Sequence, residues 1–249
     1  MRFMLRSTAA ALVMAVAAAA PARAQSFNNA QRGEIERIVK DYLIAHPELL
    51  QEVMSELEKK QTAAETEKQV AGVRAHREVL FNSAHQVTLG NPQGDVTMVE
   101  FFDYNCGYCK RALGDMLQLL KTDPKLKVVL KEFPVLGPGS KEAAEVAVAA
   151  RMQDKSGKKY LDFHQKLLGG RGAADMARAL AAAKDAGFDM ARLEKDMASD
   201  EVKATLEENL RVAEAIGLNG TPSYIIGADV VIGAQGYDAL TEKVDAARR

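Results

Sequence analysis

The chain has 249 residues, with 33 Lys and Arg against 34 Asp and Glu, and a formal net charge of −1 at pH 7. This balance excludes the basic excess that would indicate binding to nucleic acid or to an anionic membrane surface. The only two cysteines are Cys106 and Cys109, so any thiol chemistry depends on this one pair.

Residues 1–24 have the pattern of a secretory signal peptide. Arg2 and Arg6 give a basic start, residues 9–20 are apolar, and Ala22-Arg23-Ala24 is a small-x-small cleavage signal. Cleavage near Ala24 would remove three arginines, leaving 225 residues with 30 basic and 34 acidic side chains, a charge of −4. No other apolar stretch is long enough to span a bilayer. We therefore expect an exported, periplasmic protein.

Residues 25–84 are predicted to form a helical stalk. His46-Pro47 separates two stripes at helical spacing, and residues 59–76 are polar, as in an exposed helix or a flexible connector. The stripes are Ile35, Ile38, Val39, Tyr42 and Leu43, then Leu49, Leu50, Val53, Met54 and Leu57. Such helices cannot bury their own stripes, so they either pack on the rest of the chain or associate with copies of themselves. The polar connector favours a homo-oligomer, a dimer or a trimer.

The next region predicts a strand, a helix and a second strand joined by a parallel crossover. After a weak strand candidate at 86–89, residues 96–102 form an apolar run typical of a strand. A helix follows from Cys106 to about residue 120, and residues 126–133 form the second strand, ended by Pro134.

Residues 141–218 are predicted to be helical almost throughout, with helices near 144–152, 160–168, 174–186 and 190–197. Strand signals then return at 223–226 and 230–232, around a turn at 227–229, which together indicate a hairpin. A last helix is expected over 237–247.

The position of the cysteines predicts disulfide exchange. Cys106 lies where a strand ends and a helix begins, and the free N–H groups there favour a thiolate nucleophile. Cys109, one turn further on, should be less exposed and should resolve the mixed disulfide. Two alternatives compete with this reading. One is a structural disulfide, but a bridge across only two residues removes little chain entropy from the unfolded state and so stabilises the fold poorly. The other is a copper or zinc site, but zinc requires more ligands than two thiolates, and no histidine lies at ligand spacing from the cysteines. We expect no cofactor other than the redox-active disulfide.

Two motifs carry a family resemblance. Phe101-Phe-Asp-Tyr-Asn-Cys-Gly-Tyr-Cys-Lys110 and Gly220-Thr-Pro-Ser-Tyr224, separated by a helical insertion, resemble the bacterial DsbA family from about residue 86 to the end. The helices with His46-Pro-Glu-Leu-Leu50 resemble ScsC-type members, which oligomerise through such a stalk. The implied fold class is α/β, a thioredoxin fold over 85–249 with an insertion at about 140–218. The 25–84 stalk and the 1–24 signal peptide precede it.

The resemblance implies further site residues. Pro222 would follow a cis peptide bond, and the Thr221 backbone would pair with an extended substrate. Glu100 would be a buried acid that relays protons for Cys109. A buried carboxylate needs a partner, for which Lys131 on the neighbouring strand is a candidate. The alternative is that Glu100 is an exposed edge residue.

Three tyrosines are candidates for substrate contact: Tyr104 and Tyr224, which flank the motifs, and Tyr108 between the cysteines. Gly107 and Tyr108 also stand where strongly oxidising family members often carry a histidine. A less stabilised thiolate makes a less oxidising couple, which favours isomerase or reductase work.

We therefore expect a periplasmic thiol–disulfide oxidoreductase that acts on unfolded or wrongly paired exported proteins. An oligomeric disulfide isomerase is favoured, recycled by a membrane redox partner, with no nucleic acid involved. A monomeric DsbA-like oxidase is the alternative within the enzymes. A periplasmic copper-binding or chaperone-like protein is the alternative outside them.

Overall fold

The computed structural model describes residues 27–249, which belong to two compact units divided after Leu57. The predicted signal peptide at 1–24 lies outside the described residues. None of the described helices combines the length and the apolar character that crossing a membrane requires.

The first unit holds α1 (Asn29–Ala45) and the beginning of α2 (Glu48–Ala75). A capping box starts α1: the Gln31 N–H donates to Asn28 Oδ1 at 2.9 Å, and the Asn28 N–H donates to Gln31 Oε1 at 3.0 Å. The interruption predicted at His46-Pro47 falls between the two helices. α1 buries no residue, and the apolar stripe stays open to solvent, with Ile38 61% and Val53 62% exposed.

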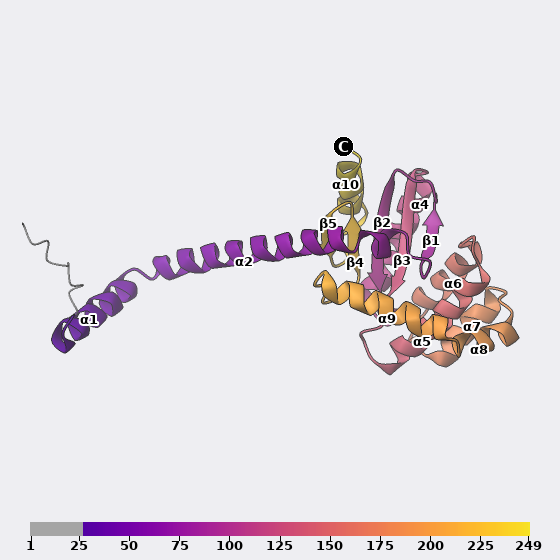
Figure 1. Ribbon diagram of the computed structural model, residues 1–249, viewed down its shortest axis with the longest axis horizontal. Helices are drawn as coiled ribbons and strands as arrows, with labels where there is room; N and C mark the ends of the chain where they lie inside the picture. The colour runs from indigo at the N-terminus through magenta and orange to yellow at the C-terminus, as the bar shows by residue number, and fades with distance from the viewer. Residues whose placement is uncertain (1–26) are drawn as a thin grey trace, which may run out of the picture. The chain divides into compact units, whose positions relative to one another are not determined.

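The second unit is built on a five-stranded sheet in the order β1-β3-β2-β4-β5 (Figure 1). The strands are β1 (Val87–Gly90), β2 (Val96–Phe102), β3 (Leu126–Glu132), β4 (Ser223–Ile226) and β5 (Asp229–Ile232). β2 and β3 are parallel and joined by α4 (Gly107–Thr122), which confirms the predicted crossover. The other three pairs are antiparallel, and β4 and β5 form the predicted hairpin.

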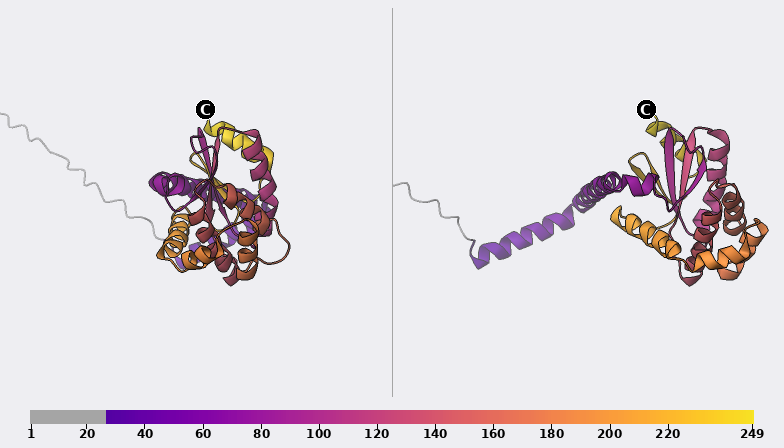
Figure 2. Two further views of the ribbon diagram at one scale, coloured as in Figure 1. Left: turned by 90° about the vertical axis from the view of Figure 1, so that its right-hand side faces the viewer. Right: turned by 45° about the vertical axis from the view of Figure 1, so that its right-hand side comes forward.

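Helices cover both faces of this sheet (Figure 2). α4 and α10 (Tyr237–Ala247) pack on one face, against Val96, Met98 and Phe102 of β2. α3 (Arg77–Phe81) and α9 (Asp200–Ala215) pack on the other face, against Val99 and Phe101. Because successive strand residues point to opposite faces, the apolar run of β2 supplies both cores at once.

The helical insertion between β3 and β4 contains α5 (Pro138–Gln153), α6 (Lys158–Leu168), α7 (Met176–Asp185) and α8 (Met190–Met197), followed by α9. Small residues let α5 approach its neighbours closely, since Ala143, Ala147 and Ala150 are fully buried. A thioredoxin-type sheet with a helical insertion is the fold class that the sequence predicted.

The chain before β1 contributes to the second core. Residues 59–75 continue α2, so the polar stretch is an exposed helix rather than a flexible connector. Val73, Leu80 and Phe81 are buried with Val99 and Phe101 beneath the sheet. The apolar residues of α3 thus belong with the sheet, although they precede the boundary expected at residues 84/85.

Candidate active site

Cys106 lies at the N-cap of α4, directly after the turn that follows β2. Its N–H donates to the Asp103 carbonyl at 3.1 Å, and its own carbonyl accepts from the Lys110 N–H at 3.1 Å. No side chain caps the first turn of α4, and no acidic residue lies in it. The N–H groups of this turn are left without a capping side chain at the end of the helix where Cys106 lies, a position that favours negative charge.

The two thiols differ in their surroundings. Cys106 is 6% exposed and Cys109 is fully buried, and the two sulfurs are not bonded to each other. Burial raises the pKa of the Cys109 thiol, with a smaller contribution from Glu100. Cys106 is thus the sulfur nearer the surface, and Cys109 is the one that keeps its proton.

The basic residues after the motif bind groups other than the Cys106 sulfur. Lys110 Nζ donates to the Gly172 carbonyl at 3.0 Å, and the Arg111 guanidinium lies 4.4 Å from the centre of the Tyr108 ring. Stabilisation of a Cys106 thiolate therefore falls to the helix start rather than to a neighbouring cation.

Thr221 and Pro222 face the thiols from the other side of the site. The peptide bond between them is cis, as the resemblance implied. The Thr221 carbonyl lies 3.2 Å from Cys106 Sγ, which donates to it. The predicted pairing of Thr221 with a substrate backbone stays a prediction.

Glu100 is buried, 2% exposed, in the middle of β2. Desolvation, reinforced by the negative charge of Asp115, raises the pKa of its carboxyl to about 8. The exposed-edge alternative is therefore wrong. Because of this shift, the side chain is largely protonated at neutral pH.

Lys131 is not the partner of Glu100, and that prediction was wrong. In the β2–β3 register Glu100 lies opposite Leu130, while Lys131 lies opposite Phe101 on the other face of the sheet. The Lys131 ammonium lies 3.5 Å from Asn209 Oδ1 and 3.9 Å from a carboxylate oxygen of Glu208.

Of the three candidate tyrosines, only Tyr108 is exposed, at 59%. Tyr104 and Tyr224 are buried, so the prediction that they line a substrate surface was wrong. The Tyr104 hydroxyl instead lies 3.3 Å from that of Tyr160 and 3.2 Å from His164 Nδ1, inside the core.

Asp103 organises the turn that carries Cys106, and the sequence reasoning missed it. Its buried carboxylate accepts four hydrogen bonds, from the N–H groups of Asn105 (2.7 Å), Val135 (2.9 Å) and Leu136 (3.0 Å) and from the Ser140 hydroxyl (2.7 Å). The turn is thereby tied to the β3–α5 connection and to the start of α5. An aspartate between a strand and a helix, two residues before an asparagine, is an Asx-turn signal that could have identified it.

Asn105 adds a second connection to the same turn. Its amide nitrogen donates to the Ala174 carbonyl at 2.8 Å, and its amide oxygen accepts from the Ala174 N–H at 2.7 Å. The active-site turn is therefore held by two separate parts of the helical insertion.

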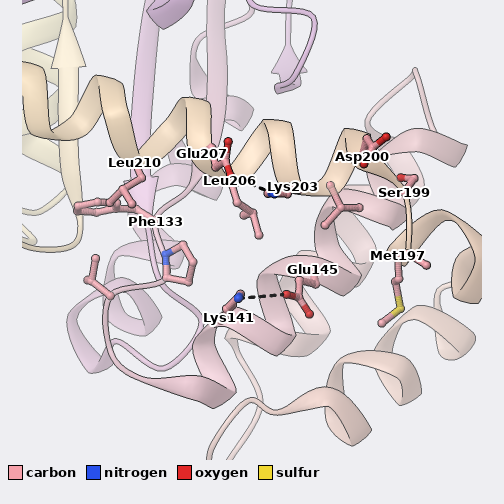
Figure 3. Close-up of a pocket in the computed structure, with 14 residues that line it drawn as sticks. Phe133, Lys141, Glu145, Met197, Ser199, Asp200, Lys203, Leu206, Glu207 and Leu210 are labelled. Atoms are coloured by element: carbon pink, nitrogen blue, oxygen red, sulfur yellow. Dashed lines mark ion pairs between the residues drawn. The ribbon is translucent and has the colours of Figure 1, made fainter.

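In the described part of the chain, the predicted site residues belong neither to a metal-binding cluster nor to the groove between α5 and α9. In residues 27–249 no group of three or more His, Cys, Asp or Glu side chains is arranged to hold a metal ion. A groove of about 590 Å³ lies between α5 and α9, bordered by Lys141, Glu145, Lys203 and Glu207 (Figure 3). None of the predicted site residues lines it.

Comparison with known proteins gives two family matches. Residues 97–245 match the DSBA-like thioredoxin domain, and residues 31–64 match the N-terminal domain of the copper resistance protein ScsC.

Solved structures agree with these matches. A thioredoxin-like oxidoreductase from Silicibacter pomeroyi is 42% identical, with 69% of this chain and 97% of that chain covered and a TM-score of 0.65. Proteus mirabilis ScsC in a transitional conformation is 29% identical, with 90% and 97% covered and a TM-score of 0.65. The thiol-disulfide exchange protein alpha-DsbA2 from Wolbachia pipientis is 29% identical, with 74% and 97% covered and a TM-score of 0.68.

Among curated proteins, the Na(+)/H(+) antiporter NhaA 1 of Salinispora arenicola is 26% identical over 160 residues. The matched segment is 64% of this chain and 24% of the antiporter. The chain thus spans about a quarter of the length of the curated relatives that it matches.

Proposed function

The chain belongs to the family of DsbA-like thioredoxin-fold oxidoreductases, and from this we propose that it exchanges disulfides with exported proteins through Cys106 and Cys109. One observation carries the proposal: Cys106 occupies the N-cap of α4 beside the Thr221 carbonyl, with Cys109 buried one turn behind it. In this proposal Cys106, the less deeply buried of the two, is the nucleophile, and the protonated Cys109 is the resolving thiol.

The reaction uses the two thiols in sequence. The Cys106 thiolate attacks a substrate disulfide, forming a mixed disulfide and releasing one substrate thiolate. Cys109 then attacks the Cys106 sulfur, which releases the second substrate thiolate and leaves the pair oxidised. Cys109 must lose its proton in that step, and we assign the role of acceptor to Glu100, buried on the strand beneath α4.

We further propose that the N-terminal helices assemble several copies, a dimer or a trimer, and that the oligomer is a periplasmic disulfide isomerase. The exposed stripe on α1 and α2 supports this, because apolar side chains such as Ile38 and Val53 are left open to solvent in a single chain. The match of residues 31–64 to the ScsC N-terminal domain covers the same helices. Its substrates would be misfolded exported proteins, and a membrane redox partner would keep the pair reduced.

Cysteine variants test the exchange reaction. Cys106→Ser should abolish both reduction of protein disulfides and refolding of a protein with scrambled disulfides. Cys109→Ser should instead accumulate a mixed disulfide with the substrate, visible as a mass increase lost on reduction. An active Cys106→Ser variant would refute the proposal.

Charged substitutions in the stripe test the assembly. The double variant Ile38→Glu, Val53→Glu should fall to monomer mass and lose scrambled-substrate refolding, while a matched Gln61→Glu change on the exposed side of α2 should do neither. A monomeric wild type that oxidises reduced substrates would favour the dithiol oxidase. Stoichiometric copper uptake that depends on Cys109, without any exchange activity, would favour a copper-binding protein.

A further inference from the structure

Two buried polar atoms beneath the active site lack a hydrogen-bond partner: Glu100 Oε2 and the Tyr224 hydroxyl. Over residues 27–249 only four buried side-chain atoms are in this condition, and the other two belong to Gln86 and Arg151. A buried polar group without a partner is destabilising, because it has lost its hydrogen bonds to water without replacing them. Two such groups in one place therefore require an explanation.

The two atoms come from directly paired residues. Glu100 of β2 lies opposite Tyr224 of β4 in the antiparallel register, so the Cβ atoms of this pair are about 4.5–5.5 Å apart on one face of the sheet. Both side chains are buried, at 2% and 0% exposure. That face is covered by α4, which carries Cys109 and packs in the same core as Tyr224.

Apart from the pair itself, the groups whose charge acts on it belong to α4 and its N-cap. Asp115 acts on Glu100, and Cys109, Asp115 and Cys106 act on Tyr224 in addition to Glu100. From β3, the residue opposite Glu100 is the apolar Leu130.

From α10, the buried side chains are the apolar Leu240 and Val244. No cation is among the groups that act on either residue.

We propose that the Tyr224 hydroxyl is a further functional residue, which orients the Glu100 carboxyl and completes the proton path between it and Cys109. A hydroxyl suits this place because it can donate to the ionised carboxylate and accept from the protonated one. Because the two atoms do not hydrogen-bond to each other directly, a single water bonded to both side chains would complete the connection, and buried waters commonly serve such pairs. The inference rests on the proposed function, because it deepens the role of Glu100.

Cys109 gives its proton to the ionised Glu100 carboxylate along the Tyr224 hydroxyl, which releases one proton as it takes up another. The Cys109 sulfur then forms a bond to Cys106, and the bond between Cys106 and the substrate sulfur breaks. The substrate leaves as a thiolate, so the substrate is reduced, the cysteine pair is oxidised, and Glu100 ends protonated.

Burial raises the pKa of Tyr224 above its usual value, with Glu100 as the next cause. The phenol is therefore protonated before and after the step, and it passes a proton on as a bridge rather than accepting one as a base. This agrees with a positioning role and distinguishes Tyr224 from Glu100, whose own proton comes and goes.

The test is the pH dependence of mixed-disulfide resolution in the full-length Tyr224→Phe variant, measured in single turnovers. In the wild type the rate should rise with pH as Glu100 ionises, with a midpoint near its pKa of about 8. Without the hydroxyl, the ionised carboxylate loses a donor, so the midpoint should move upward and the rate at pH 7 should fall at least about tenfold. Tyr237→Phe, which removes a hydroxyl bonded to Thr122 away from the thiols, should match the wild type.

A second measurement separates a proton path from a structural effect. If the two residues act as one unit, Glu100→Gln and Tyr224→Phe should be non-additive, so that the double variant is no slower than Glu100→Gln alone. Additive effects, or an unchanged midpoint in a folded Tyr224→Phe variant, would overturn the inference. Should the variant not fold, the wild type still decides: the infrared band of the Tyr224 phenol, assigned with isotope-labelled tyrosine, must shift as Glu100 ionises, and an unchanged band would overturn the inference.

Different results would refute the proposed function and the role of Tyr224. Exchange activity that survives Cys106→Ser would refute the proposed function. Exchange that requires both cysteines but keeps the wild-type pH profile in Tyr224→Phe would refute only the role of Tyr224. Alkylation of Cys106 should proceed at the wild-type rate in Tyr224→Phe, because capture of substrate precedes the proton step.

Discussion

Asp103→Asn should be strongly destabilising, because the carboxylate holds four donors from three segments of the chain. The donors are the N–H groups of Asn105, Val135 and Leu136 and the Ser140 hydroxyl, at 2.7 to 3.0 Å. An asparagine keeps one acceptor oxygen and turns an NH₂ group toward the other two donors. Hydrogen bonds to a charged group contribute about 1.5–3 kcal/mol each, so losing two costs about 3–6 kcal/mol.

Urea unfolding measures this cost. A shift of the midpoint with an unchanged m-value would report lost stability rather than a changed denatured state. Asp175→Asn is the matched control, because the exposed Asp175 caps α7 with one bond to the Arg178 N–H at 2.9 Å, and asparagine caps a helix about equally well. A change of less than about 1 kcal/mol in Asp103→Asn would refute the reasoning.

The same variant has a second readout at Cys106. The turn that Asp103 holds presents Cys106 to the helix start, where a well-placed anion gains about 0.3–1 kcal/mol. Loosening the turn should therefore slow alkylation of Cys106 at pH 7 by about two- to fivefold, the rate equivalent of that energy. Alkylation at the wild-type rate in a folded Asp103→Asn variant would show that the turn does not tune the thiol.

Packing and burial predict the effects of four further substitutions. Gly94→Ala would place a Cβ against the Lys125 carbonyl and 2.7 Å from the Lys127 nitrogen, so thermal unfolding should show a loss of about 1–3 kcal/mol; Gly114→Ala, in α4 with open space around it, should gain about 0.5–1 kcal/mol. Burial raises the pKa of the Glu100 carboxyl to about 8, so the contribution of this group to folding stability is complete below pH 4.5 and is lost as the pH rises through about 8. Urea titrations over this pH window should show a smaller loss of stability in Glu100→Gln than in the wild type. Burial lowers the pKa of His164 to about 3, so its contribution is complete above pH 6.5 and declines as the pH falls toward 3; His164→Asn should reduce that slope, and an unchanged slope would contradict the assignment.

The elements of the second unit could be predicted from the sequence because their signals are local. β2 and α10 have the expected bounds. The apolar run of β2 and the amphipathic stretch of α10 each lie between turn residues, which fix where the element begins and ends. The cis bond before Pro222 came only from the family resemblance, because the physical preference of a single X–Pro bond is trans.

The errors concern which way side chains point. Lys131 was paired with Glu100 because both are charged residues on neighbouring strands, but a one-residue difference in register puts them on opposite faces. Tyr104 and Tyr224 were placed at the surface because they flank the motifs, whereas the insertion covers Tyr104 with α6 and the sheet pairs Tyr224 with Glu100. Sequence patterns give the period of a strand and not the partner that covers it.

The protonation of Glu100 bears on the direction of the proposed reaction. With a pKa of about 8, the carboxyl holds its proton in most molecules at pH 7. A protonated acid beneath α4 assists the step in which Cys109 leaves as a thiolate, which is the oxidation of a substrate dithiol by the disulfide form. The reverse step needs the ionised carboxylate. Substrate oxidation should therefore slow, and mixed-disulfide resolution should accelerate, as the pH rises through about 8. Single-turnover rates that change in the same sense in both directions would exclude Glu100 as the shared proton donor and acceptor.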